Sequence, residues 1–160
     1  MDLIKFKTTG SVRNADTIIR LGPFRPLNPL RKEISQTLMK ALIVDDSRTM
    51  RRLLSAYLSE FTSDIVEAED GLDALEKLRN TAPVDVALVD WDMPRMNGLE
   101  LVKSVRSNPV HSKMKILMVT SHNSMEDVGA GLEAGAGDFL MKPMTEDMLK
   151  DKLRFLGLIP

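Results

Sequence analysis

The sequence of 160 residues contains no cysteine, and only 4% of it is aromatic. Without cysteine the chain forms neither disulfide bonds nor thiolate metal sites, a composition typical of the reducing cytoplasm. So few aromatic side chains argue against stacking on single-stranded nucleic acid. No apolar run approaches the roughly 20 residues that cross a bilayer, and no signal-peptide pattern opens the chain. We therefore expect a cytoplasmic protein with no membrane contact.

The formal net charge is only −1, but the two signs are unevenly distributed along the chain. Residues 1–38 contain seven Lys or Arg against three Asp or Glu, which leaves 15 basic and 20 acidic residues in 39–160. Because an acidic surface repels DNA phosphates, we expect no nucleic-acid partner. The hydrophobic share of 43% and the charged share of 28% are those of a globular domain.

Residues 1–38 show no sustained helical or strand period. Three prolines fall within seven positions, at Pro23, Pro26 and Pro29. Such a segment buries too little apolar surface to offset the entropy of ordering it. We expect a disordered N-terminal extension, either a basic arm for an acidic partner or a segment without function. Met39 stands directly before a strand pattern, so a start of translation at Met39, with residues 1–38 not translated, is a further hypothesis.

From Met39 onward, five short apolar runs alternate with amphipathic segments. The runs are 41–44, 64–68, 84–89, 115–119 and 138–141, and the amphipathic segments are 50–61, 72–78, 99–105, 125–132 and 148–156. Strands that alternate with helices predict βαβ units and therefore an α/β fold, a flavodoxin-like three-layer sandwich with a five-stranded parallel sheet and five helices. The first, third and fourth runs are almost continuously apolar, as in central strands, whereas the second alternates like an edge strand.

Polar residues stand at the ends of four of the five predicted strands. They are Asp45 and Asp46 after the first, Asp90 after the third, Thr120 at the fourth and Lys142 after the fifth. Ligands of open parallel sheets bind beyond these carboxyl ends, so we expect the five side chains to meet. Close carboxylates repel one another unless a cation joins them, and Mg²⁺ is the hard ion that suits oxygen ligands. With Lys142 as counter-charge, the set predicts phosphoryl transfer onto an aspartate.

Two stretches of sequence resemble bacterial response-regulator receiver domains. They are residues 43–53 (IVDDSRTMRRL) and 90–101 (DWDMPRMNGLEL), and the pairs Thr120-Ser121 and Lys142-Pro143 complete the family's set. The resemblance covers 39–160, which we therefore expect to be the receiver domain, and within the family it is greatest to the chemotaxis regulators. It implies the strand order 2-1-3-4-5, which the strand pattern alone does not fix.

The resemblance assigns the phosphoacceptor and the metal ligands. Asp90 is expected to accept the phosphoryl group from a histidine kinase, of the chemotaxis type, in a Mg²⁺-dependent reaction. Asp46 is expected to hold Mg²⁺ directly, Asp45 mainly through water, and Asp92 through its backbone carbonyl. Phosphorylation and dephosphorylation would be self-catalysed and stoichiometric, so the chain is expected not to be an enzyme with turnover.

The resemblance also implies a switch. Lys142 would pair with the phosphoryl group, and the bond from Lys142 to Pro143 would be cis. Thr120 would move its hydroxyl to a phosphate oxygen, and Phe139 would turn inward with it. The switch would be read on the face made by the fourth helix, the fifth strand and the fifth helix.

The expected output is protein contact, because no DNA-binding domain follows the last helix. A monomer that binds a flagellar motor switch is favoured, and a phosphorelay shuttle or phosphate sink is the alternative. A remote alternative is a haloacid-dehalogenase-like phosphatase, since Asp90-Trp91-Asp92 resembles its DxD motif, although there the further acids come later in the chain. A flavin site is excluded because two carboxylates follow the first strand, where a phosphate would have to bind.

Two positions near Asp90 carry unusual residues for a receiver. Asp92 is a fourth carboxylate where many receivers have an uncharged or basic residue, and we expect it to tune the lifetime of the phosphorylated state. His122 lies two residues past Thr120, near the mouth of the site, and could tune dephosphorylation through access. Otherwise, His111 and His122 are expected to be solvated loop residues without a matching partner. Phe139 replaces the Tyr common in chemotaxis regulators, which keeps the ring and loses a hydroxyl.

Overall fold

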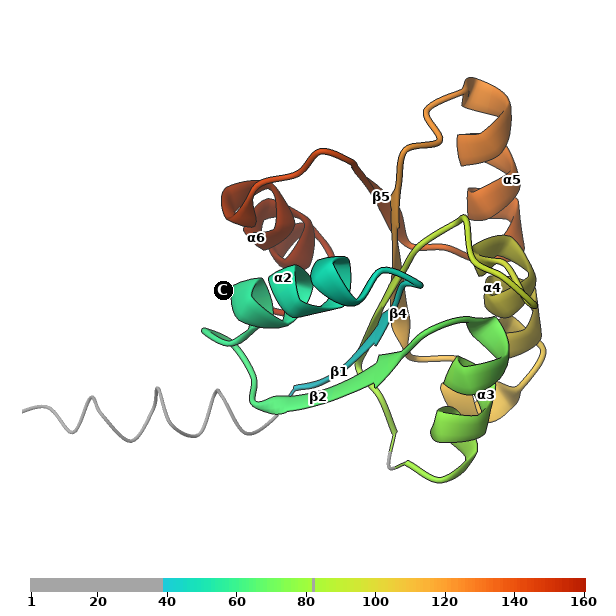
Figure 1. The fold of residues 1–160 in the computed structure, drawn as a ribbon, viewed down its shortest axis with the longest axis horizontal. Helices are drawn as coiled ribbons and strands as arrows, with labels where there is room; N and C mark the ends of the chain where they lie inside the picture. The colour runs from blue at the N-terminus through green and yellow to red at the C-terminus, as the bar shows by residue number, and fades with distance from the viewer. Residues whose placement is uncertain (1–38, 82) are drawn as a thin grey trace, which may run out of the picture.

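The computed structural model describes residues 39–81 and 83–160, so the expectations for residues 1–38 lie outside the described part. Five parallel strands form one sheet in the order β2-β1-β3-β4-β5, which confirms the predicted topology and the edge position of the second strand (Figure 1). The strands are β1 (Lys40–Val44), β2 (Asp64–Ala68), β3 (Val86–Val89), β4 (Lys115–Thr120) and β5 (Asp138–Met141).

Helices cover both faces of the sheet, as a three-layer sandwich requires. They are α2 (Arg48–Leu58), α3 (Gly71–Arg79), α4 (Gly98–Arg106), α5 (Met125–Ala134) and α6 (Glu146–Phe155), with a 3₁₀ turn η1 (Pro109–His111) before β4. Figure 1 shows α2 and α6 on one face and α3, α4 and α5 on the other. Within the described residues, no helix is long and apolar enough to cross a membrane.

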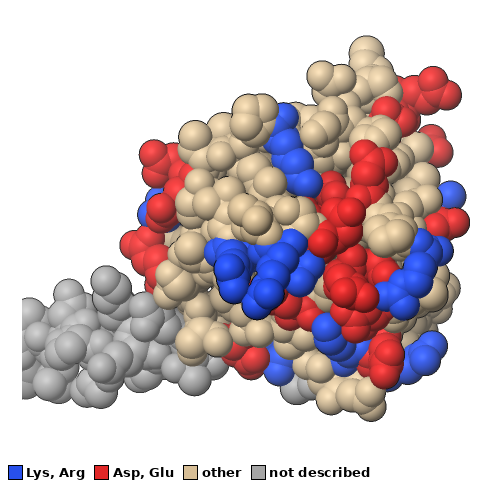
Figure 2. Space-filling view, viewed as in Figure 1, with Lys and Arg blue, Asp and Glu red and all other residues tan. Residues whose placement is uncertain are grey.

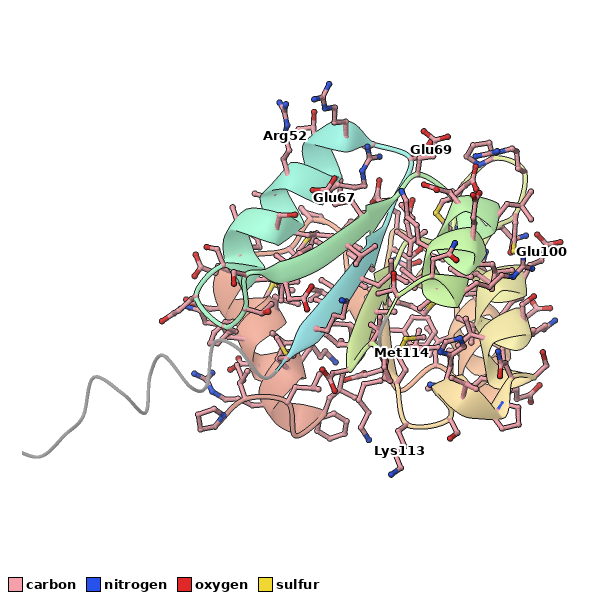
Figure 3. All side chains as sticks on the ribbon, turned by 90° about the horizontal axis from the view of Figure 1, so that it is seen from below. Arg52, Glu67, Glu69, Glu100, Lys113 and Met114 are labelled. Carbon is pink, nitrogen blue, oxygen red and sulfur yellow. The ribbon has the colours of Figure 1, made fainter. Side chains whose placement is uncertain are left out.

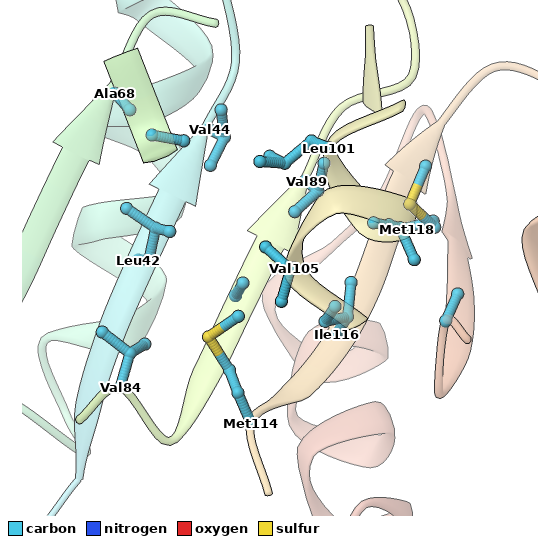
Figure 4. Close-up of a cluster of buried hydrophobic side chains, with 14 of the residues drawn as sticks. Leu42, Val44, Ala68, Val84, Val89, Leu101, Val105, Met114, Ile116 and Met118 are labelled. Atoms are coloured by element: carbon cyan, nitrogen blue, oxygen red, sulfur yellow. The ribbon is translucent and has the colours of Figure 1, made fainter. Parts of the chain in front are cut away.

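The alternation of side chains along β1 divides the core into two clusters. Leu42 and Val44 belong to the cluster that includes buried residues of α3 and α4, and Figure 4 shows Leu101 and Val105 of α4 in it. Ala41 and Ile43 belong to the cluster on the side of α2 and α6. Each fully buried Leu or Ile of this kind contributes about 1.5–3 kcal/mol to folding. Burial on both faces explains why the central strands read as continuous apolar runs.

Each of the five α-helices begins behind a polar N-cap whose side chain accepts a hydrogen bond from a backbone N–H in the first turn. The caps are Ser47, Asp70, Asn97, Ser124 and Thr145. Such caps satisfy N–H groups that have no partner inside the helix. Because they follow the strands within a few residues, they fix short loops at the carboxyl edge of the sheet, where the predicted site residues lie.

Candidate functional site: an acidic cluster at the carboxyl edge of the sheet

Asp45, Asp46 and Asp90 meet at the carboxyl edge, as predicted. Val44 pairs with Val89 in the parallel register of β1 and β3, and the Asp90 N–H donates to the Val44 carbonyl at 2.8 Å. One carboxylate oxygen from each aspartate lies within 4.8 Å of the other two. Asp45 is 1% exposed and Asp90 7% exposed, whereas Asp46 is exposed. The cluster therefore has two buried carboxylates and one that faces solvent.

Lys142 reaches this cluster from the end of β5, an edge strand of the sheet. Its N–H donates to the Thr120 carbonyl, which continues the pairing of β4 and β5, and its peptide bond to Pro143 is cis. The Lys142 Nζ lies 2.9 Å from Asp45 Oδ2 and 3.0 Å from Asp90 Oδ1. One ammonium group thus bridges the two buried carboxylates.

Burial and charge act on these groups in opposite directions. Burial raises the pKa of Asp90 and outweighs the lowering by Lys142. For Lys142, burial lowers the pKa, but the hydrogen bonds to Asp45 and Asp90 together raise it above its usual value. Three carboxylates against one lysine leave an excess of negative charge. Oxygen ligands of this kind suit Mg²⁺, so the donor set fits the predicted ion.

The backbone of Asp45 is fixed from α2. Arg51 donates from Nη1 to the Asp45 carbonyl at 2.8 Å and from Nε to Glu67 at 3.1 Å. Glu67 lies on β2 beside α2 (Figure 3). The Ser47 N–H in turn donates to Asp45 Oδ1 at 2.8 Å. Figure 2 shows acidic side chains gathered through the middle of this face, with basic side chains on both sides.

The loop between β3 and α4 is anchored by residues that the sequence pattern did not single out. Arg95, with a φ of 63°, forms ion pairs with Glu69 at 3.0 Å and with the buried carboxylate of Asp70. At the far end of the loop, the Gly98 N–H donates to the Trp91 carbonyl at 2.9 Å. A Cβ at Gly98 would overlap the Asp90 carbonyl oxygen, so only glycine permits this approach. These contacts hold the segment that follows Asp90.

Asp92 and His122 are in contact with each other, which corrects the expectation that His122 lacks a partner. The His122 Nε2 lies 3.0 Å from Asp92 Oδ2, and Nδ1 lies 3.1 Å from Asp127 Oδ2. The His122 ring also stacks on Trp91, with 5.0 Å between ring centroids. Hydrogen bonds to Asp127 and then to Asp92 raise the pKa of His122. Ser124 completes the arrangement by donating to Asp127 at 2.7 Å.

The carboxylate of Asp92 therefore points away from the other three acids. It is 73% exposed, and the group of acids close enough to share an ion in the described ranges 39–81 and 83–160 does not include it. The strands β3 and β4 are neighbours, and the register that pairs Val89 with Met118 brings the loop that contains Asp92 beside the loop that contains His122. The predicted strand order, with the third and fourth strands as neighbours, is the signal by which the proximity of these two loops could have been anticipated.

Thr120 and Phe139 both lie inside the fold. The buried hydroxyl of Thr120 accepts a hydrogen bond from the His122 N–H at 3.0 Å. The Phe139 ring is 7% exposed and packs in the cluster on the side of α3, α4 and α5. The ring thus already occupies the inward position that the resemblance associates with the activated state.

Comparison with known proteins gives one consistent result. The response regulator receiver domain family matches residues 41–154. A chemotaxis protein, CheY1 of Helicobacter pylori, is 45% identical over 116 residues, which cover 72% of this chain and 94% of that protein. The CheY homologue of Campylobacter jejuni is 44% identical and covers 72% of this chain and 89% of its own length.

Solved structures agree with the sequence relatives. The chemotaxis protein CheY4 of Vibrio cholerae superposes with a TM-score of 0.70 at 35% identity, covering 75% of this chain and 99% of that one. A response-regulator structure from Chloroflexus aurantiacus, described as putative, gives a TM-score of 0.67 at 30% identity, covering 74% of this chain and 98% of that one.

Proposed function

The chain belongs to the family of response regulator receiver domains, and we propose that it is a switch driven by phosphorylation of Asp90. The observation that carries the proposal is the position of Asp90, a buried carboxylate at the centre of the carboxyl edge with Lys142 3.0 Å away. Receiver domains work with a histidine kinase and a downstream target, and both partners are implied here.

The transfer step follows from the chemistry of a carboxylate nucleophile. An Asp90 oxygen attacks the phosphorus of a phosphohistidine on the kinase, an O–P bond forms and the P–N bond breaks. The histidine nitrogen keeps the electron pair and takes up a proton. Lys142 faces the oxygens on which negative charge is spread, and most of the remaining rate comes from positioning. Asp90 is phosphorylated once per event, so the chain is a phosphoacceptor and not an enzyme with turnover.

Asp45, Asp46 and Asp90, with the carbonyl of Asp92, are the residues that would hold Mg²⁺. The fit rests on three carboxylates within 4.8 Å whose charge a single lysine does not balance. When bound, the ion would neutralise charge on the phosphoryl oxygens. Asp45 is already occupied by Lys142 and Ser47, which agrees with a ligand that acts through water.

The signal would leave through Thr120 and Phe139 to the face of α5, β5 and α6. That face carries a groove whose walls include Val128, Leu132 and Met148, and Leu132 and Met148 are exposed. We infer that a flagellar motor switch is the partner, because the relatives above are chemotaxis proteins. A phosphorelay shuttle or phosphate sink is the alternative output. The haloacid-dehalogenase-like interpretation is not retained, because residues 41–154 match the receiver domain family.

We further propose that Asp92 and His122 set the lifetime of the phosphoryl group. Hydrolysis needs a water molecule in line with the Asp90–phosphorus bond, and a free carboxylate near that water would orient it. His122 instead holds the Asp92 carboxylate at 3.0 Å, turned away from the cluster. The pair would therefore slow hydrolysis, and the stacked Trp91 and His122 rings would restrict access of water.

A two-part experiment tests the proposed function. First, the protein is incubated with Mg²⁺ and phosphoramidate, and intact mass is measured. A gain of one phosphoryl group in wild type, lost in Asp90→Asn and on removal of Mg²⁺ with a chelator, supports the proposal; a gain in Asp90→Asn contradicts it. Second, binding to a motor-switch peptide is compared with and without beryllofluoride, and equal affinities would favour the shuttle or sink.

A further inference from the structure

The ring of Phe139 points end-on at the backbone of Gly131. Phe139 lies on β5 with its side chain toward the α5 layer, and Gly131 is the buried residue of α5. A Cβ built on Gly131 would overlap the ring at Cζ and lie 3.3 Å from Cε1 and 3.4 Å from Cε2. Every one of these nearest atoms belongs to the same ring. The inward place of the ring therefore exists because position 131 has no side chain.

This glycine weakens the helix that contains it. Glycine inside a helix is less favourable than alanine, and α5 contains two glycines, Gly129 and Gly131. At Gly129 an added Cβ would meet no atom within 4 Å, so packing does not require glycine there. At Gly131 the ring of Phe139 requires it. Gly129 and Gly131 thus lie in the same helix and have the same helix-propensity cost, but they differ in the contact with the Phe139 ring.

The Phe139 ring also has a second position available, in a groove at the surface. Phe139 forms part of the wall of the groove between α5 and α6, together with Val128, Leu132 and Met148. A ring displaced from Gly131 would swing into this groove, where exposed Leu132 and Met148 would cover it. The groove belongs to the proposed read-out face, so a ring lying in it would compete with a partner.

We propose that Gly131 is a positioning residue of the switch, one that opens the inward place for the Phe139 ring and thereby sets the balance between a covered and an open groove. The inference rests on the proposed function, because it concerns the response to modification of Asp90. If modification of Asp90 favours the inward ring, then the inward ring favours binding of a phosphoryl mimic by the same factor. A side chain at position 131 disfavours the inward ring and must therefore weaken binding of the mimic.

The test compares Gly131→Ala with Gly129→Ala, its matched control in the same helix. Affinity for beryllofluoride with Mg²⁺ is measured by the fluorescence of Trp91, the one tryptophan in the chain, which adjoins Asp90. We expect Gly131→Ala to weaken binding on the order of tenfold and Gly129→Ala to leave it unchanged. Crystal structures should show the ring in the groove in Gly131→Ala and inward in Gly129→Ala. Equal affinities in the two variants, or an inward ring with α5 displaced, would overturn the inference.

A double variant keeps the test independent of a folding defect. Leucine at 139 lacks the atoms that an added Cβ would overlap, so Gly131→Ala/Phe139→Leu should bind beryllofluoride as Phe139→Leu does. The same tenfold loss in this background would count against the ring. Failure of the wild type itself to respond to beryllofluoride would overturn the proposed function. A responding wild type with indistinguishable alanine variants would overturn only the role of Gly131.

Discussion

The carboxylate of Asp92 and the imidazole of His122 are 30 residues apart in the chain and 3.0 Å apart in space. The contact joins the loop after β3, which begins at the buried Asp90, to the loop after β4. Asp127 holds the other ring nitrogen, and Trp91 stacks on the ring, so the position of His122 is fixed from three sides.

Breaking this contact should shorten the phosphorylated state. In His122→Ala the Asp92 carboxylate is free to orient water, and we expect dephosphorylation to accelerate several-fold; a positioned carboxylate of this kind contributes up to about 10²–10⁴-fold. The measurement is loss of phosphate from labelled protein after the donor is removed. In the double variant His122→Ala/Asp92→Asn, the rate of dephosphorylation should return toward that of wild type. Acceleration that persists in the double variant would assign the effect to access and not to Asp92.

Protonation of His122 should stabilise the fold. The pKa of His122 is raised above the usual 6.5 in the folded state. Its contribution to the free energy of unfolding is therefore fully present below the pKa of the unfolded state and disappears as the pH rises through the pKa of the folded state. The free energy of unfolding of wild type minus that of His122→Gln should therefore be largest below about pH 6.5 and decline above it. Urea denaturation at several pH values measures this difference. A difference that grows with rising pH would contradict the assignment.

Removing one buried charge should stabilise the ion-free protein. Burial raises the pKa of Asp90 in the folded state above the ordinary value of 3.8. The free energy of unfolding therefore falls as the pH rises from 3.8 to the folded-state pKa, and this loss remains at neutral pH. Asp90→Asn should therefore raise the free energy of unfolding at pH 7 by on the order of 1 kcal/mol. Chemical denaturation in a chelator measures the gain, and excess Mg²⁺ should reduce it, because wild type binds the ion more tightly.

Loss of Lys142 should have the opposite effect. Lys142→Met leaves Asp45 and Asp90 buried without their shared cation, and breaking a buried ion pair in this way costs about 3–5 kcal/mol. We expect a fall of that order in the free energy of unfolding without Mg²⁺, partly restored by the ion. Lys152→Met, which removes the more exposed pair with Asp138, is the control and should cost about 1 kcal/mol or less.

Arg95 should matter to the site without touching it. Arg95→Ala leaves the buried N-cap Asp70 without its ion-pair partner and frees the loop that follows Asp90. An unpaired buried carboxylate should lower the free energy of unfolding by about 2 kcal/mol and slow phosphorylation by phosphoramidate. Arg52→Ala, on the outer side of α2 (Figure 3), is the control and should change neither.

Much of the site was predictable from local pattern. Alternating strand and helix periods predicted parallel strands, and the parallel arrangement placed Asp45, Asp46, Asp90 and Lys142 at one edge. The helix boundaries were less accurate. The segment expected over 50–61 is a helix from Arg48 to Leu58, because Ser47 caps its start and Ser59 its end. The predicted third strand begins at Val86, two residues later than the apolar run.

The fold class, the edge of the sheet at which the chemistry lies and the residues at that edge could be predicted from residue patterns, because strand period, helix period and strand-end position are local properties. Three contacts became visible only in the folded chain: Asp92 with His122, Arg95 with Asp70, and Phe139 with Gly131. Each of these contacts joins side chains from different loops or elements. Their partners depend on strand register, backbone approach and side-chain rotamer, none of which is written in the period of a single segment.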